Sequence, residues 1–248
     1  MKINIESIKD FVKKSLPFPL SKNHAYDTQT AKVINTLLNK KSNTIDIGAH
    51  RGAILQYLIR CAPQGKHYAF EPIPQCAEYL RENFSNNASI FELALSNEVG
   101  KSIFNYVVSK PQFSGLQKRP YDINEEDKKI TVSVSTLDTL LSIGDIVSPI
   151  DLVKIDVEGG EFNVIKGGCE FFTKQAPTLI FEHGMTSVEM NSMVVTDIYD
   201  YLNEVCGLDV NLMSRFLRRD PPLTKELFKS KMESGEYYFM AHKTKTSY

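Results

Sequence analysis

Acidic residues and glycines stand at the ends of two apolar runs, where they could bind a nucleoside cofactor. The first run contains Asp46, and the second ends at Glu71. The turn after the first run contains three small residues, Gly48, Ala49 and Gly52. Small residues let a backbone approach a ligand closely, and an acid at the end of a neighbouring strand accepts hydrogen bonds from ribose hydroxyls. We therefore expect Glu71 to bind a ribose and the turn to contact the rest of the cofactor.

The spacing of the glycines disfavours two common nucleotide cofactors. A dinucleotide fingerprint is Gly-x-Gly-x-x-Gly, and a Walker loop requires Gly-Lys-Ser/Thr. Here Gly48 and Gly52 give Gly-x-x-x-Gly, and Ala53 follows the second glycine. Neither a dinucleotide nor a nucleoside triphosphate is therefore favoured, and an NAD-dependent reductase is the weakest interpretation.

Several short motifs follow one another in an order that resembles the FkbM family of S-adenosylmethionine-dependent methyltransferases. They occupy residues 46–52, 70–72, 94–96, 136–138, 152–159, 161 and 181–183. The most specific is Lys-Ile-Asp-Val-Glu-Gly, which begins at Lys154. The resemblance covers about residues 44–183 and resumes weakly at the final strand. It implies S-adenosylmethionine as cofactor and a class I methyltransferase fold, which is Rossmann-like with a doubly wound, mostly parallel sheet.

The resemblance also implies roles for the acidic and aliphatic residues. Glu71 accepts hydrogen bonds from both ribose hydroxyls in a charge-assisted pair. Asp46 orders the turn or binds the ammonium of the methionine portion, directly or through water. Glu92, Ala94 and Leu95 follow the third strand and meet the adenine. The sequence has no Trp, so aliphatic side chains must cover the adenine ring.

Transfer of a methyl group to an alcohol requires removal of the hydroxyl proton by a base or with the help of a metal. His183 is the preferred general base, because the unperturbed pKa of histidine lies near neutrality. Asp156 is the alternative base, or it contacts the methionine end of the cofactor. Carboxylates near both residues could hold Mg²⁺, but Glu158 and Glu161 could equally pair with lysines and brace the loops. No ligand spacing is diagnostic, so no metal site is predicted.

The elements that position these residues form an α/β pattern. Apolar runs alternate with helical stretches, which predicts a mostly parallel sheet whose carboxyl edge holds the ligand. We expect core strands at 44–47, 68–70, 89–95, 152–155 and 178–181, and an antiparallel strand pair at about 208–213 and 236–242. Expected helices span 27–38, 53–61, 73–84, 136–143, 161–167 and 194–205. We expect residues 1–24 to form an N-terminal extension with a helix at 3–15, and residues 25–248 to form a single domain.

The composition limits the other possibilities. The chain has 248 residues and a net charge of −1, so nothing favours a nucleic-acid partner. No apolar run approaches the roughly 20 residues of a membrane span, and the N-terminus lacks a signal-peptide core. The four cysteines form no Cys-x-x-Cys pair, which favours a reducing cytoplasm. The antiparallel edge near the C-terminus is a possible homodimer surface.

A small molecule or glycan is the acceptor that the resemblance leads us to expect. The resemblance implies methylation of a hydroxyl on a sugar, a glycan intermediate or a natural product. Methylation of nitrogen or of a carboxylate is the alternative, as is a non-catalytic scaffold that only binds the cofactor. The loop at 109–128 and the region 184–235 should select the acceptor, because they are long and polar and border the carboxyl edge of the sheet. Two candidate contacts lie in the turn at 48–52, here called the cofactor turn, namely His50 and Arg51. The other candidate contacts are Tyr106, Phe113, Tyr121, Arg215, Arg218 and Arg219.

Overall fold

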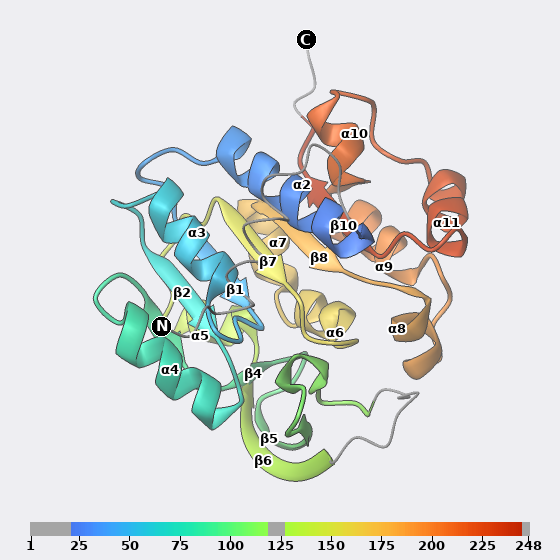
Figure 1. Ribbon diagram of the computed structural model, residues 1–248. Coiled ribbons are helices and arrows are strands. Elements are labelled where there is room, and N and C mark those ends of the chain that lie inside the picture. The colour runs from blue at the N-terminus through green and yellow to red at the C-terminus, as the bar shows by residue number, and fades with distance from the viewer. Residues whose placement is uncertain (1–20, 119–126, 245–248) are drawn as a thin grey trace, which may run out of the picture.

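A mixed sheet forms the centre of the molecule in the computed structural model, which describes residues 21–118 and 127–244 (Figure 1). The order of its seven strands is β3-β2-β1-β7-β8-β10-β9. Their bounds are β1 Thr44–Ile47, β2 His67–Phe70, β3 Ser89–Phe91, β7 Leu152–Ile155, β8 Thr178–Glu182, β9 Asp209–Asn211 and β10 Tyr238–His242. The first five strands of the order are parallel, whereas β10 is antiparallel to both of its neighbours. The expected doubly wound sheet and its C-terminal antiparallel pair are confirmed.

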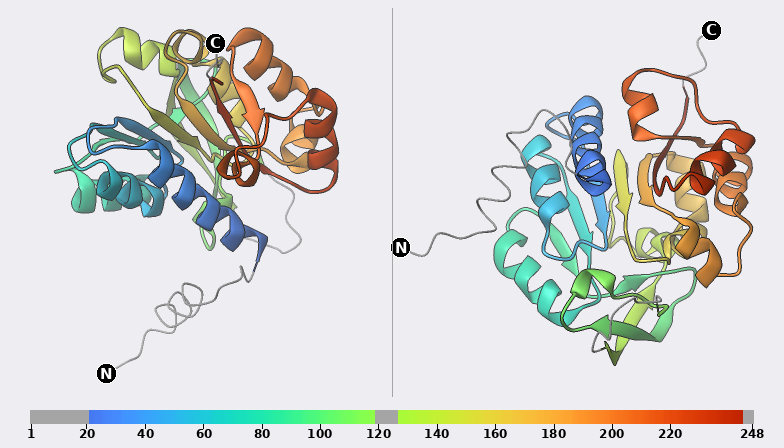
Figure 2. Two further views of the ribbon diagram at one scale, coloured as in Figure 1. Left: turned by 90° about the horizontal axis from the view of Figure 1, so that it is seen from above. Right: turned by 45° about the vertical axis from the view of Figure 1, so that its right-hand side comes forward.

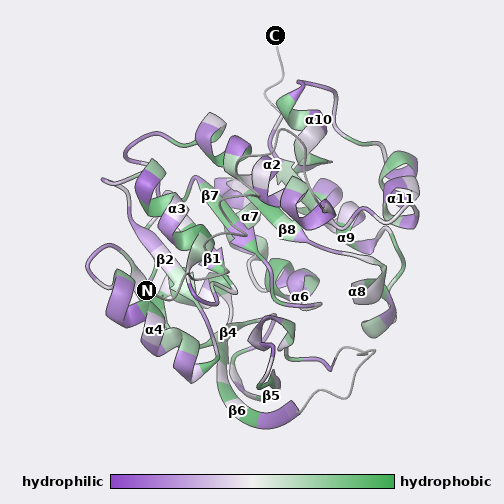
Figure 3. Cartoon of the chain, viewed as in Figure 1, coloured by the Kyte–Doolittle hydropathy of each residue, from purple (hydrophilic) through white to green (hydrophobic). Residues whose placement is uncertain are grey.

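Alternating side chains on these strands supply two separate cores. Ile45 and Val153 point to one face and pack in the largest core cluster, while Leu152 and Ile180 belong to the cluster on the other face. Burial on both faces explains why the strands are continuous apolar runs. The colouring of Figure 3 shows the contrast, with β8 largely hydrophobic and the outer helix α4 largely hydrophilic.

Helices cover both faces of the sheet, as the two views in Figure 2 show. On one face lie α2 Lys22–Leu37, α3 Ala53–Cys61, α4 Pro74–Phe84 and α10 Met213–Leu217. On the other lie α5 Leu137–Ser142, α6 Glu161–Lys166, α7 Cys169–Gln175, α9 Asp197–Asp200, the π-helical turn η2 Tyr201–Val205 and α11 Lys225–Glu233. A further short helix, α8 Met185–Met190, follows β8. No helix in residues 21–118 or 127–244 is long and apolar enough to cross a membrane.

A second, smaller sheet stands beside the carboxyl edge of the first. It consists of β4 Ala94–Leu95, β6 Asp127–Ser135 and β5 Gly100–Val107, in that order, with the 3₁₀ turn η1 Pro111–Phe113 after β5. The prediction of one strand at 89–95 is wrong, because the chain leaves the main sheet after β3 and pairs with β6 instead. The apolar pattern continues through both strands, so the pattern alone does not reveal the change of sheet.

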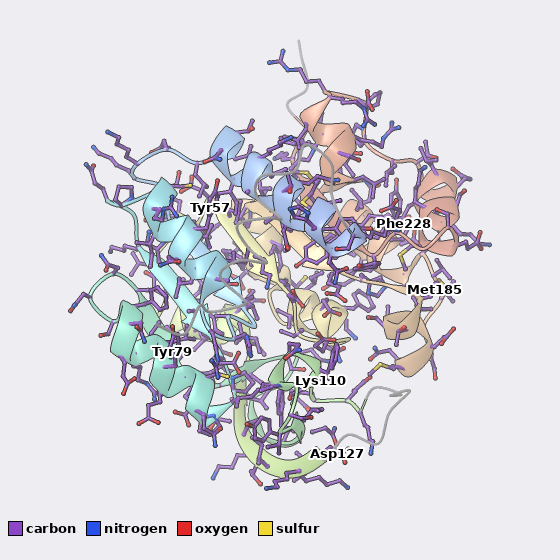
Figure 4. The ribbon with its side chains drawn as sticks, viewed as in Figure 1. Tyr57, Tyr79, Lys110, Asp127, Met185 and Phe228 are labelled. Carbon is purple, nitrogen blue, oxygen red and sulfur yellow. The ribbon has the colours of Figure 1, made fainter. Side chains whose placement is uncertain are left out.

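The other differences from the expected elements concern helices. The second expected helix starts at Lys22 rather than at 27, so the expected domain boundary at residue 25 falls inside α2. Three short helices, α7, α8 and α10, were not expected, and α11, which carries the Phe228 labelled in Figure 4, occupies a stretch for which no element was expected. The expected helix at 3–15 and the candidate residue Tyr121 lie outside the described residues.

Candidate functional site

A cavity of about 270 Å³ opens at the carboxyl ends of β1, β2 and β7. It is lined by most of the residues expected to bind the cofactor, namely Asp46, Gly48, Ala49, Glu71, Ala94, Leu95 and Asp156. These residues come from the main sheet and from β4 of the small sheet. The topology brings them together because parallel strands end at the same edge of a sheet. Residues of the motifs at 46–52, 70–72, 94–96 and 152–159 therefore meet at this edge, whereas those at 136–138 and 181–183 do not line the cavity.

Glu71 is held in the cavity wall by two backbone hydrogen bonds. Its Oε2 accepts from the N–H of His50 at 2.8 Å, and its Oε1 accepts from the N–H of Ile73 at 2.9 Å. The side chain is buried, and burial raises its pKa to about 7 against the opposing effect of those two bonds. Each carboxylate oxygen keeps acceptor capacity for a further donor. Glu71 thus connects the cofactor turn to the start of α4 while it faces the cavity.

Asp46 lies on β1 opposite Lys154 of β7, and both side chains are buried. The Lys154 Nζ lies 3.8 Å from Asp46 Oδ1 but 3.2 Å from Asp156 Oδ2. Lys154 therefore pairs mainly with Asp156, and neither Asp46 oxygen has a hydrogen-bond partner among the described residues. The N–H of Leu55 faces Asp46 without reaching hydrogen-bonding geometry. Burial raises the pKa of Asp46.

Asp156 is a cavity carboxylate that is stabilised by both an ion pair and a hydrogen bond. It is half-buried and accepts a hydrogen bond from the Tyr238 hydroxyl at 3.0 Å. Burial acts to raise the pKa of Asp156, but Lys154 and this hydroxyl hold it below the usual range. Burial likewise acts to lower the pKa of Lys154, and Asp156 and Asp46 raise it instead. The lysine is therefore charged, and it stabilises the ionised form of Asp156.

Both glycines of the turn are placed where a side chain would collide with another part of the protein. Gly48 has a φ of +78°, and a Cβ there would lie 1.8 Å from the carbonyl oxygen of Asp156. Gly52 caps α3 with a φ of +76°, and its Cβ would meet Leu80 and Phe84 of α4. Gly48 lines the cavity, whereas Gly52 stands behind it. The expectation that Gly52 contacts the cofactor is not supported, because this glycine makes room for a helix.

Glu92 does not line the cavity. Its carboxylate is exposed and forms a salt bridge with Arg81 of α4 at 2.7 Å. The alternation of side chains after β3 turns Leu93 toward the cavity and Glu92 toward solvent. The adenine role expected for Glu92 is therefore not supported, and the apolar wall comes from Ile73, Leu93 and Leu95.

His183 also lies outside the cavity lining. Its side chain is 1 % exposed, and neither ring nitrogen has a hydrogen-bond partner in the described part of the chain. Burial lowers its pKa to about 4, so the ring is neutral at physiological pH. The sequence placed His183 correctly after β8, but the direction of a side chain after a strand depends on the local twist, which the sequence does not specify.

Glu161 braces the loop that follows β7. Its side chain is buried, and Oε1 accepts from the N–H groups of Val157 and Gly159, each at 3.1 Å. Burial raises its pKa to about 7. The bracing role weighed for Glu161 is confirmed, but its partners are backbone groups rather than a lysine. Lys166, one of the lysines considered, lies over the ring of Phe162 at 4.7 Å instead.

Of the residues proposed to contact the acceptor, only those of the cofactor turn line the cavity. His50 and Arg51 do so. His50 has a φ of +49°, its Nε2 is buried without a partner within the described ranges, and burial and Arg51 lower its pKa. Arg215 and Arg218 bond to Pro221 and Asp220, respectively, on the surface loop after α10. The five other described candidates are absent from the lining, namely Tyr106, Phe113, Arg215, Arg218 and Arg219.

A stretch after β5 provides the cavity wall that faces the turn. The residues from it that line the cavity are Pro111, Gln112, Ser114 and Leu116. The expectation that the loop at 109–128 borders the site therefore agrees with the structure for its described part. No group of three or more His, Cys, Asp or Glu side chains suited to a metal ion occurs in the residues that the structure describes.

Comparisons with known proteins agree with this architecture. The family described as "Methyltransferase FkbM domain" matches residues 46–209 of this chain. A similar solved structure is the methyltransferase FkbM of Methylobacillus flagellatus, with a TM-score of 0.52 and 14 % identity over 84 % of this chain and 47 % of that one. At that identity, the likeness concerns the fold.

Two curated relatives are similar in sequence. The 2-O-methyltransferase NoeI of Sinorhizobium fredii is 32 % identical over 57 % of this chain and 63 % of its own length. The methyltransferase sdnD of Sordaria araneosa is 29 % identical over 58 % of this chain and 64 % of its own length. The matched stretch thus spans less than two thirds of either relative.

Proposed function

Because this chain belongs to the FkbM methyltransferase family, we propose that it binds S-adenosylmethionine in the cavity described above. The observation that supports this most strongly is the pair of buried acids in the cavity wall. Both oxygens of Asp46 lack hydrogen-bond partners among the described residues, which suits the ammonium of the methionine portion. Glu71 retains acceptor capacity on two fixed oxygens, which suits a ribose diol.

We propose further that the acceptor is a hydroxyl of a sugar, a glycan intermediate or a natural product. The relative described as a 2-O-methyltransferase supports oxygen as the acceptor atom. The sulfonium of the bound cofactor supplies an electrophilic methyl group. Fixed geometry in the cavity then contributes much of the acceleration, since positioning accounts for about 7–11 kcal/mol in well-oriented reactions.

Asp156 is the group that we propose to receive the hydroxyl proton. Of the two expected catalytic residues, it alone lines the cavity. As the new C–O bond forms, the hydroxyl oxygen becomes strongly acidic, so even a carboxylate with a lowered pKa accepts the proton. Tyr238 and Lys154 orient the carboxylate through its Oδ2. The proton passes to Asp156, and the electrons of the broken C–S bond remain on sulfur.

The test is calorimetric titration of the full chain with S-adenosylmethionine, S-adenosylhomocysteine and NADH. We expect both adenosyl ligands to bind at micromolar concentration and NADH not to bind. The variant Glu71→Ala should lose at least about tenfold in affinity, as expected for two charge-assisted hydrogen bonds. Equal binding of the adenosyl ligands by wild type and variant would exclude the proposed site.

A non-catalytic scaffold remains the second candidate function. It would bind the same ligands in the same way, so titration does not separate it from an enzyme. Transfer of a labelled methyl group to a mixture of hydroxylated glycans and natural products does separate them. Formation of a methylated product that depends on Asp156 would support an enzymatic function. Absence of a methylated product with every acceptor class would support the scaffold.

A further inference from the structure

The stretch of residues 111–117, here called the roof, lies directly against the loop of residues 157–160. A Cβ on Gly115 would lie 3.3 Å from the carbonyl oxygen of Glu158 and 3.5 Å from that of Val157. Residues from both segments line the same cavity as Glu71. The roof and the loop therefore form two adjoining walls of the proposed cofactor site.

Hydrogen bonds at Ser114 and Gly115 attach the roof to β5. The N–H of Asn105 donates to the Gly115 carbonyl at 2.9 Å, and the Gly115 N–H returns a bond at 3.2 Å. The Val107 N–H donates to the Ser114 hydroxyl at 2.9 Å. These bonds hold the roof on its own hairpin, but none of them joins it to the main sheet.

One side chain, Asn191 at the end of α8, joins the roof to the main body. Its Oδ1 accepts from Gln117 Nε2 at 2.7 Å. Its Nδ2 donates to the carbonyl of Gly159 at 2.9 Å and to that of Ser187 at 2.8 Å. Both ends of the amide are therefore used, and each end contacts a different segment. Asn191 is half-buried, which limits competition from water.

We propose that Asn191 is a positioning residue that latches the roof against the loop after β7 and thereby retains the bound cofactor. This inference rests on the proposed function, since it concerns the same cavity. The latch acts on two walls of the site rather than on the ligand. Loss of the latch should therefore increase the rate at which the ligand leaves, while the direct ligand contacts of Asp46 and Glu71 persist.

The experiment measures the dissociation rate of S-adenosylhomocysteine by stopped-flow displacement from the full chain. Asn191→Ala should dissociate about tenfold faster than wild type, as expected for the loss of more than one hydrogen bond. Asn191→Asp keeps the acceptor for Gln117 but places an oxygen against two carbonyls, so it should also dissociate faster. Asn86→Ala, an exposed asparagine after α4, is the matched control and should behave as wild type.

Gln117→Ala tests the link to the roof separately. It removes only the bond to Asn191, so its effect should be smaller than that of Asn191→Ala. The double variant should dissociate no faster than Asn191→Ala, because the first substitution already removes the shared bond. Additive effects would show that the two residues act independently and would overturn the latch.

Hydrogen exchange supplies a readout that a general loss of stability would not produce. In Asn191→Ala, amides of the roof, including Gly115, should exchange faster while those of β7 stay protected. Unchanged dissociation with unchanged roof exchange would overturn the inference but leave the proposed function intact. Failure of the wild-type chain to bind S-adenosylhomocysteine would instead overturn the proposed function, and with it the latch as a means of cofactor retention.

Discussion

Each carboxylate of the site has a different environment, and the environment decides its chemistry. Glu71 has two backbone donors, Asp156 has a lysine and a tyrosine, and Asp46 has Lys154 at 3.8 Å but no hydrogen-bond partner among the described residues. Burial of a carboxylate without hydrogen bonds is costly, so Asp46 is the residue of the three that gains most from a bound cation. The three acids are therefore not interchangeable, although they lie in one cavity.

Glu71 should make binding of S-adenosylhomocysteine depend on pH. Ribose hydroxyls donate to the ionised carboxylate, and the pKa of Glu71 is raised to about 7 by burial. Affinity should therefore rise between about pH 6 and pH 8, because deprotonation of Glu71 no longer has to accompany binding. Calorimetry across this range tests the expectation. Glu71→Gln should bind S-adenosylhomocysteine more weakly, and the pH dependence of its affinity should reflect only the titration of other groups. Parallel curves of affinity against pH for wild type and variant would contradict the role of Glu71 in ribose binding.

Asp156 and His183 should differ in what their substitution changes. Asp156→Asn should lower kcat by about 10²–10⁴-fold, the usual contribution of a general base. His183→Ala should affect stability more than turnover, since the ring is buried away from the cavity. The measurement is methyl transfer to an acceptor found by screening, alongside urea unfolding of each variant. A large loss of kcat in a stable His183 variant, with Asp156→Asn active, would restore His183 as the base.

At the scale of elements, the cofactor turn and the loop after β7 depend on each other. The turn passes so close to β7 that only glycine fits at position 48. Glu161, at the start of α6, in turn fixes the loop by accepting from the N–H groups of Val157 and Gly159. The two segments that carry Asp46 and Asp156 are therefore positioned by backbone contacts, not by the acidic side chains themselves.

Gly48→Ala should disrupt the site far more than the matched substitution Gly144→Ala. Both glycines have a positive φ, of +78° and +85°, so both variants carry similar backbone strain. Only at position 48 would the new Cβ collide with another backbone atom, the Asp156 carbonyl. We expect Gly144→Ala to cost about 1–2 kcal/mol of stability and to keep ligand binding. Gly48→Ala should cost more and abolish binding, and equal unfolding midpoints would contradict this account.

At the scale of the whole molecule, Glu71 and Glu161 should each contribute a stability that is lost as the pH rises toward neutrality. The pKa values of Glu71 and Glu161 are both raised from 4.5 to about 7. A raised pKa means that the folded state binds the proton more tightly, so the associated stability is fully present below pH 4.5 and is lost as the pH rises through about 7. Each group contributes on the order of 3 kcal/mol to this change.

Urea unfolding at a series of pH values measures this effect. The double variant Glu71→Gln and Glu161→Gln should show a flatter dependence of unfolding free energy on pH between about 5 and 7.5. Glutamine keeps one oxygen, which suffices at position 161, where Oε1 accepts both bonds. At position 71 one of the two backbone donors loses its acceptor, so the comparison concerns the slope of the curve and not the absolute stability. Curves of equal slope for wild type and variant would show that neither acid holds its proton in the folded state.

The sequence by itself determined the sheet and the position of most site residues along it. Short apolar runs that are buried on both faces define parallel strands, and parallel strands end at one edge. Asp46, Gly48, Glu71 and Asp156 could therefore be assigned to one site from the sequence. Each of these residues lies at or beside the carboxyl end of a strand, so the direction of the parallel strands alone places it at this edge of the sheet.

Only the tertiary structure decided which side chains enter the cavity and which elements close it. His183 and Glu92 also follow strands, but one side chain is buried away from the cavity and the other pairs with Arg81 in solvent. These directions depend on strand twist and on the packing of neighbouring helices, which no local pattern specifies. The latch at Asn191 joins residues far apart in sequence, and such long-range hydrogen bonds exist only after the sheet and its hairpin have packed.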